Sequence, residues 1–279
     1  MSQTGYYRQP TICKDLIIFV SDDDLWSVNA RGGIAGRLTP GKDKCLFPKL
    51  SPDGKLVAYL GMEEGHPEVF VMSSEGGTPK RLTYLGSDQA FVLGWSQDGK
   101  KIIISSDART PFFRHAEAYE LCPETSELTP LKLGHVLTLS SGKFGKTVIG
   151  RNNLDPGTWK RYRGGRAGQM WIDTEGKGEY KRLLDLKGNM VSPMWIKDRI
   201  YFLSDHEGIG NIYSCRPNGN EVIRHTHHSE YFVRFPSTDG ERIVYSAGAN
   251  LYVLDCSSNG VSPVDAETPT QEQHRSRSF

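Results

Sequence analysis

Asp24-Leu25-Trp26-Ser27-Val28 and Glu68-Val69-Phe70-Val71-Met72 are the first two of six short segments that share one design, with an aromatic side chain at the same central place. The other four segments are Glu117-Ala118-Tyr119-Glu120-Leu121, Gln169-Met170-Trp171-Ile172-Asp173, Asn211-Ile212-Tyr213-Ser214-Cys215 and Asn250-Leu251-Tyr252-Val253-Leu254. A repeat of roughly 40 to 50 residues that contains several short strands is typical of a β-propeller blade. The repeat therefore indicates the architecture before any single residue is considered.

A predicted apolar strand with a period of two precedes each of these segments, as in Leu56-Val57-Ala58-Tyr59-Leu60. It directly follows a turn such as Asp53-Gly54. Asp-Gly supplies the positive φ that a tight hairpin needs. The pattern predicts an all-β six-bladed β-propeller with four antiparallel strands per blade and almost no helix. The predicted blades span residues 6–39, 45–83, 91–133, 136–184, 190–226 and 231–264.

The two ends of the chain fall in the first and last predicted blades. Neither end offers a strand to the other's sheet, so the ring is expected to close by side-chain packing and without strand exchange between the termini. The propeller is expected to occupy residues 1–264. Residues 265–279 are polar and aperiodic, which predicts a disordered tail.

Composition narrows the class of protein. The 34 basic and 33 acidic side chains give a net charge of +1, so neither nucleic acid nor a membrane is an expected partner. Five scattered cysteines lack paired or metal-ligand spacing, which favours a reducing, cytoplasmic location over a disulfide framework. The N-terminus lacks the basic start and apolar core of a signal peptide.

The fourth blade carries a long insertion between its second and third strands, and binding residues often lie on such loops. Guanidinium groups match carboxylates in two-point geometry, and aromatic rings can stack on a ligand. The alternative is a loop that packs on the next blade with its charges in water. The candidate peptide-binding residues of this insertion are Arg151, Trp159, Lys160, Arg161, Arg163 and Arg166.

Two further candidates come from aligning the innermost strands on Pro10, Pro48, Pro193 and Pro236, which places Arg8 and Arg234 at equivalent positions in the first and last blades. Both could then face the channel or its rim and contact a peptide carboxylate. The alternative is that each forms an ordinary ion pair with a nearby carboxylate such as Asp22 or Glu230.

Two histidine-containing motifs fit ordinary turns better than functional sites. His225-Thr226-His227-His228 lacks the partners of a metal site, and Ser204-Asp205-His206-Glu207-Gly208 is favoured as a structural turn. The chain contains no nucleophile elbow, phosphate loop or His-Glu-x-x-His motif. No catalytic residue, metal or cofactor is therefore expected.

Several strings resemble the N-terminal six-bladed propeller of the tricorn protease family, over about residues 6–254. The most discriminating lie in the fourth and fifth blades, whereas Ser-Pro-Asp-Gly is shared with TolB and propeller peptidases. The strings are Tyr6-Tyr7-Arg8-x-Pro10-Thr11-Ile12, Phe19-Val20-Ser21-x-Asp23-Asp24-Leu25-Trp26, Ser51-Pro52-Asp53-Gly54-Lys55, Arg81-Leu82-Thr83-Tyr84-Leu85-Gly86, Trp159-Lys160-Arg161-Tyr162-Arg163-Gly164-Gly165 and Ser192-Pro193-Met194-Trp195.

The resemblance implies a noncatalytic part of a cytoplasmic serine peptidase that trims oligopeptides released by the proteasome or similar proteases. In that family a second propeller and a catalytic half with a PDZ domain follow, six subunits form a ring, and the catalytic residues match no position of this chain. It implies a role as peptide channel or gate and as a docking surface. The expected partners are peptides, partner peptidases, the remaining tricorn-like domains and further copies of the chain.

The alternative is a stand-alone scaffold of the TolB or WD40-like kind whose rim loops bind another protein. Propellers host many functions, so the fold alone does not decide between the two.

Overall fold

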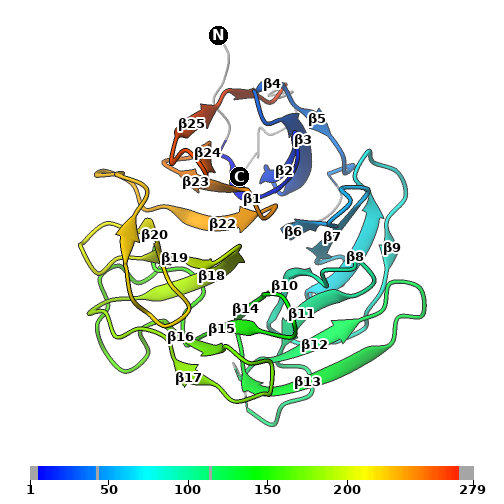
Figure 1. Cartoon of the computed structure of the whole chain (residues 1–279). Helices are drawn as coiled ribbons and strands as arrows, with labels where there is room; N and C mark the ends of the chain where they lie inside the picture. The colour runs from blue at the N-terminus through cyan, green and yellow to red at the C-terminus, as the bar shows by residue number, and fades with distance from the viewer. Residues whose placement is uncertain (1–5, 42–43, 113–114, 270–279) are drawn as a thin grey trace, which may run out of the picture.

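The computed structural model describes residues 6–41, 44–112 and 115–269, and these form strands, turns and loops without a helix. Six four-stranded sheets stand around a common axis, each built from strands in chain order (Figure 1). The prediction of an all-β six-bladed propeller with four antiparallel strands per blade is thereby confirmed. No helix that could cross a membrane is found in the described part of the chain.

In the first three blades the strands follow chain order from the innermost outward. Blade one contains β1 (Arg8–Cys13), β2 (Leu16–Ser21), β3 (Asp24–Asn29) and β5 (Gly36–Arg37). Blade two contains β6 (Leu46–Leu50), β7 (Leu56–Gly61), β8 (Glu68–Ser73) and β9 (Lys80–Arg81). Blade three contains β10 (Ala90–Trp95), β11 (Ile102–Ser106), β12 (Glu117–Leu121) and β13 (Leu128–His135).

The last three blades have the same order. Blade four contains β14 (Thr138–Ser141), β15 (Thr147–Arg151), β16 (Gln169–Asp173) and β17 (Lys181–Arg182). Blade five contains β18 (Met190–Ile196), β19 (Arg199–Ser204), β20 (Asn211–Cys215) and β21 (Ile223–Arg224). Blade six contains β22 (Arg234–Thr238), β23 (Arg242–Ala247), β24 (Asn250–Asp255) and β25 (Val261–Val264).

A buried threonine follows the fourth strand in three blades, within Leu38-Thr39, Leu82-Thr83 and His225-Thr226. In blade one, Thr39 Oγ1 accepts a hydrogen bond from the Leu25 amide at 3.0 Å and donates to Asp24 at 2.7 Å. The same three-group link recurs in blades two and five, through Thr83 with Glu68 and Thr226 with Asn211. Each link satisfies polar groups where the short outer strand stops, because a buried donor or acceptor without a partner is costly.

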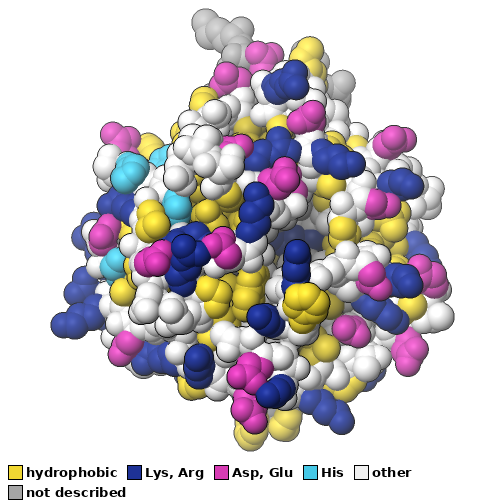
Figure 2. Space-filling model, viewed as in Figure 1, with side chains coloured by type: hydrophobic (Ala, Val, Ile, Leu, Met, Phe, Trp, Pro, Cys, Tyr) yellow, Lys and Arg dark blue, Asp and Glu magenta, His cyan; other side chains and the backbone are white. Residues whose placement is uncertain are grey.

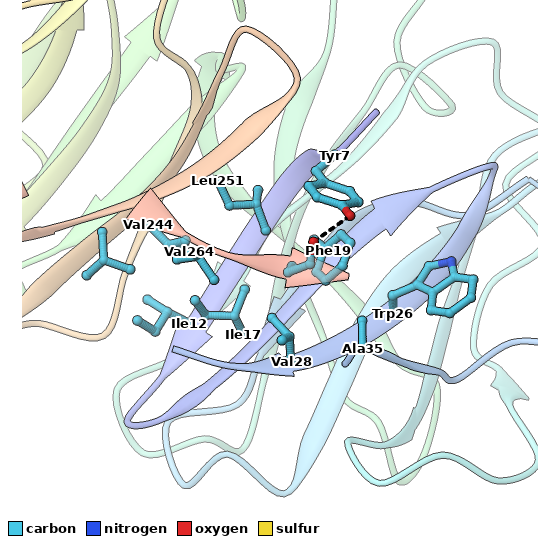
Figure 3. Close-up of a cluster of buried hydrophobic side chains, with 12 residues drawn as sticks. Tyr7, Ile12, Ile17, Phe19, Trp26, Val28, Ala35, Val244, Leu251 and Val264 are labelled. Atoms are coloured by element: carbon cyan, nitrogen blue, oxygen red, sulfur yellow. Dashed lines mark hydrogen bonds between the residues drawn. The ribbon is translucent and has the colours of Figure 1, made fainter. Parts of the chain in front are cut away.

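A cluster of buried apolar side chains joins the last blade to the first (Figure 3). Ile12, Ile17 and Phe19 of blade one pack with Val244 and Leu251 of blade six, and all are buried. The Tyr7 and Phe19 rings meet edge to face with centroids 4.9 Å apart. The ring is therefore closed by a continuous hydrophobic core, and none of the six four-stranded sheets contains a strand from the opposite end of the chain.

Backbone hydrogen bonds add to this closure. The segment that follows blade six forms β26 (Ala266–Glu267), which pairs in parallel with β4 (Gly33–Ile34) of blade one. The Gly33 and Ala35 amides donate to the Asp265 and Glu267 carbonyls at 2.9 and 2.8 Å. The ordered chain thus extends beyond the boundary predicted at 264, because its backbone finds partners in blade one. The rest of the predicted tail, 270–279, lies outside the described residues.

Candidate functional site

A channel cavity of about 410 Å³ lies along the axis of the ring, and residues from the inner strand of every blade line it. Its wall is mostly apolar, with Leu93, Trp95, Leu139 and Met194 among its members. A concave apolar cavity that contains a few polar groups is the usual form of a ligand site. The channel is therefore the first candidate site.

The prolines of four inner strands mark an irregularity that shapes this wall. Before each proline a residue adopts a left-handed backbone, with φ between 49° and 52°: Gln9, Phe47, Ser192 and Phe235. At each of these places the register with the second strand shifts. A bulge of this kind redirects the side chains that follow it. The residues after the prolines, Thr11, Lys49, Met194 and Ser237, line the cavity.

Three phenylalanine rings in the channel wall contact one another. Phe47 meets Phe91 and Phe235 edge to face, with ring centroids 5.2 and 6.0 Å apart. The three residues come from blades two, three and six and are only half-buried. Rings that belong to different blades therefore form one apolar part of the channel wall.

Lys49 is the one basic side chain among the described residues that line the channel cavity, and it is not among the residues predicted from the sequence. Its ammonium group donates a hydrogen bond to Ser237 Oγ across the channel at 3.3 Å. Its backbone carbonyl accepts from Trp95 Nε1 at 2.9 Å, which fixes the inner strand of blade two against blade three. Burial lowers the pKa of Lys49 to about 8, since a low-dielectric site disfavours the charged form.

A second cavity, of about 910 Å³, lies at one mouth of the channel and shares Phe235 with it. Its lining contains four of the eight predicted peptide-binding residues: Arg8, Lys160, Arg161 and Arg234. Figure 2 shows Lys and Arg side chains around the hollow in the middle of the viewed face, with acidic side chains beside several of them. The structure thus brings together residues from the first, fourth and last blades at one opening.

The two arginines that aligned in the sequence are both ion-paired. Arg8 contacts Asp23 at 3.0 Å, and Arg234 is held by Asp155 through Nε at 2.8 Å and through its terminal nitrogen. Both side chains thus form ion pairs, and the carboxylates that hold them are Asp23 and Asp155. The Arg234 partner belongs to the blade-four insertion, so a salt bridge across the mouth fixes that loop to blade six.

The blade-four insertion, residues 152–168, is tied down at a second point. The Arg161 amide donates to Asp205 Oδ2 at 3.0 Å, and the same buried carboxylate accepts two hydrogen bonds from Asn189. The Lys160 ammonium lies 5.6 Å from the Phe232 ring centroid. The insertion is therefore packed over blades five and six while its long side chains reach the mouth.

The other four predicted residues do not line the mouth. Trp159 stacks on Tyr162 with centroids 4.0 Å apart, and Arg163 and Arg166 are exposed. Arg151 donates to the Leu133 carbonyl at 3.1 Å and lies over the Trp171 ring, so it joins blades three and four. The predicted cluster is thus divided between the mouth, the outer surface and a blade interface.

Two serine–histidine contacts are buried structural links. Ser204 Oγ lies 3.0 Å from His206 Nδ1 and also accepts from the His206 amide, which makes a local turn. Ser214 Oγ lies 2.7 Å from His225 Nε2, and His225 Nδ1 lies 2.8 Å from Asn259 Oδ1. Both serines are fully buried, so no substrate can reach them.

The direction of the second link follows from Asn259, whose Oδ1 can only accept. Nδ1 of His225 therefore carries the proton, and in the neutral ring Nε2 accepts the hydrogen bond from Ser214 Oγ. Arg199 Nε donates to the same serine oxygen at 2.8 Å. Burial lowers the pKa of His225 accordingly. Within residues 6–41, 44–112 and 115–269, no group of three side chains is arranged to hold a metal ion.

These features define a six-bladed propeller domain with an axial channel, and comparison with known proteins gives its family. The domain family described as the tricorn protease N-terminal beta propeller matches residues 4–260. The chain belongs to this family. The resemblance seen in the sequence is thereby confirmed.

Two relatives give the scale of the similarity. The tricorn protease homolog of Saccharolobus solfataricus is 34% identical over 277 residues, which covers 99% of this chain and 26% of the relative. The crystal structure of the tricorn protease superposes with a TM-score of 0.87 at 30% identity, covering 96% of this chain and 27% of that one. The chain therefore spans about a quarter of the length of these relatives.

A third comparison concerns a divided relative. In Sulfurisphaera tokodaii, a putative tricorn-like protease N-terminal subunit is 34% identical over 173 residues, covering 60% of this chain and 86% of the subunit. The corresponding C-terminal subunit is 39% identical over 100 residues, covering 36% of this chain and 12% of that subunit. Tricorn-like proteins thus occur as separate polypeptides, and the propeller sequence is shared between them.

Proposed function

We propose that this chain is the noncatalytic propeller of a tricorn-like serine peptidase of the cytoplasm, which degrades oligopeptides downstream of the proteasome or similar proteases. The propeller acts as a peptide channel and as a docking surface for the remaining domains. The observation that carries the proposal is the axial channel itself. Its mostly apolar wall suits an extended peptide, Lys160 and Arg161 at its mouth offer contacts to a carboxylate, and the chain's family supplies the peptidase context.

The volume of the channel cavity supports a selection by size. A space of about 410 Å³ lined by side chains of all six inner strands suits a short extended segment better than a folded domain. The divided relative supports the docking role, because separate N-terminal and C-terminal subunits must associate to act together.

A variant that obstructs the channel tests the proposal. Leu93 is half-buried in the channel wall, and Leu93→Trp adds an indole there, whereas Leu56→Trp adds one at a partly exposed position outside the lining. Fluorescence anisotropy with labelled tripeptides to hexapeptides is expected to show binding to the unaltered protein and to Leu56→Trp, and at least a tenfold loss in Leu93→Trp. Equal binding by all three proteins would contradict a channel role.

A further inference from the structure

The charge balance of the channel differs from that of its mouth. At the mouth, Arg8 and Arg234 are each neutralised by a carboxylate. In the channel cavity, Lys49 has a neutral hydroxyl as its hydrogen-bond partner, and no carboxylate of the described residues lies within 4.0 Å of its ammonium group. Asp239 also lines the cavity, but its carboxylate pairs with Arg242 at 3.1 Å, so the Lys49 charge has no carboxylate beside it among the described residues.

A charge in this position is costly to the folded protein. Removing an ammonium group from water disfavours it unless a countercharge or several hydrogen bonds compensate. Loss of hydration is the cause of the lowered pKa of Lys49, and no neighbouring charge offsets it. A residue of this kind in a binding cavity indicates an anionic ligand.

The fold also fixes where the charge lies. The bulge at Phe47 and Pro48 directs the Lys49 side chain into the channel, and the hydrogen bond from Trp95 to the Lys49 carbonyl holds the strand beneath it. The Phe47 ring, with its partners Phe91 and Phe235, stands on one side along the axis. A ligand beside Lys49 would thus place an anionic group against the ammonium group. Its apolar groups would contact the phenylalanine rings and Met194.

We propose that Lys49 binds a carboxylate of a short peptide inside the axial channel, with an adjacent apolar side chain against the phenylalanine rings. The inference rests on the proposed role of the channel in passing peptides. A compact ammonium group with one neighbouring hydroxyl suits a single carboxylate, whereas two-point recognition would need a guanidinium. The carboxylate could be the peptide's C-terminus or an acidic side chain.

The test uses three tripeptides of matched sequence and isothermal titration calorimetry at pH 7. The first peptide ends in phenylalanine with a free carboxylate, the second is its C-terminal amide, and the third is an amide with glutamate in the middle position. Lys49→Met keeps the length of the side chain without the charge. Lys55→Met is the matched control, since Lys55 is 82% exposed and does not line the channel.

The expected result is that one of the carboxylate peptides binds at least tenfold more tightly than the neutral amide. Tighter binding of the first peptide would identify a C-terminal carboxylate as the ligand of Lys49. Tighter binding of the third peptide would identify an acidic side chain. Lys49→Met should bind all three peptides equally, at the affinity of the neutral amide, and Lys55→Met should match the unaltered protein. A pH series on the unaltered protein adds a measurement that needs no variant: the preference should decline as the pH rises through about 8.

Two results would overturn the inference, and they differ from each other. If charged and neutral peptides bind the unaltered protein equally, Lys49 does not bind a carboxylate, but the channel still binds peptide. If none of the three peptides binds, the proposed function is wrong together with the inference.

Discussion

The Tyr7 hydroxyl donates a hydrogen bond to the Ala266 carbonyl at 2.8 Å and so joins two residues that are 259 positions apart (Figure 3). Tyr7 is buried, its amide donates to the Ala249 carbonyl at 3.1 Å, and its ring packs on Phe19. One side chain thus connects the first blade, the last blade and the segment after it.

Tyr7→Phe is expected to lower the free energy of unfolding by about 1 to 2 kcal/mol, because the buried Ala266 carbonyl loses its donor while the ring packing remains. Urea denaturation measures the change. Tyr84→Phe is the matched control, since Tyr84 is 80% exposed, and it should leave stability unaltered. Equal stability of the two variants would mean that the hydroxyl contributes nothing to closure.

A glycine at the same junction gives a second prediction. Gly32 has a φ of +92°, and a Cβ there would lie 2.7 Å from the Asp265 carbonyl oxygen. Gly65 has a similar φ of +84° with nothing within 4 Å. Gly65→Ala should therefore show backbone strain alone, about 1 kcal/mol, and Gly32→Ala about 2 to 3 kcal/mol, since it also displaces β26. Thermal unfolding compares them, and a smaller loss in Gly32→Ala would contradict a role of β26 in closing the ring.

The ion pair at the channel mouth gives a third prediction. The Asp155 side chain is 6% exposed and holds Arg234, whereas Asp23, which pairs with Arg8, is 52% exposed. Asp155→Ala should cost about 2 to 3 kcal/mol and should increase hydrogen exchange in residues 152–168, because it leaves a partly buried cation unpaired. Asp23→Ala should cost less than about 1 kcal/mol. Unchanged exchange in Asp155→Ala would mean that the salt bridge does not hold the loop.

Acid should destabilise the protein through its buried histidines. Burial lowers the pKa of His225, His228 and His206 in the folded state, so these rings are neutral there. Below about pH 6.5 the unfolded chain takes up protons that the folded protein does not, and stability falls as the pH falls. Urea denaturation between pH 7.5 and 5 measures this dependence.

Variants test whether the titration of His225 contributes to the loss of stability in acid. His225→Gln should be less stable than the unaltered protein at pH 7.5, by about 1 to 3 kcal/mol, because it breaks the link from Ser214 to Asn259. That deficit should shrink toward pH 5, where His225 no longer favours the fold. His66→Gln, at an exposed position, should follow the unaltered protein throughout. A deficit for His225→Gln that is independent of pH would exclude a contribution from its titration.

The repeating pattern predicts the blades because each strand pair buries its own alternating face, and that information is local in the sequence. The β26–β4 pairing is not predicted, because two-residue parallel contacts are made by backbone groups and leave no side-chain pattern. The recurring Leu-Thr is visible in the sequence, but its role depends on an acidic or amide residue about 15 positions earlier, such as Asp24 for Thr39.

The candidate site is predicted only in part. Aligning the inner strands on their prolines selects Arg8 and Arg234, which precede the bulge and lie at the mouth. The residues that follow the four prolines occupy one position of the same alignment. Lys49 is charged at that position, whereas Thr11, Met194 and Ser237 are not. What the sequence could not supply is the left-handed backbone at Gln9, Phe47, Ser192 and Phe235, since a non-glycine residue rarely adopts it.

Because of these bulges, most of the residues that pack the blades together differ from the residues that line the channel. The residues that pack one blade on the next belong largely to the alternating faces of the second and third strands, whereas a single position after each proline supplies much of the channel lining. Met194 also packs in the cluster that joins blades five and six, and Thr11 accepts a hydrogen bond from Leu50 of blade two, whereas a substitution at Lys49 can alter the charge of the channel and leave those contacts in place. Position 49 is therefore a place where relatives of this chain can differ in the charge of the channel on an unchanged frame.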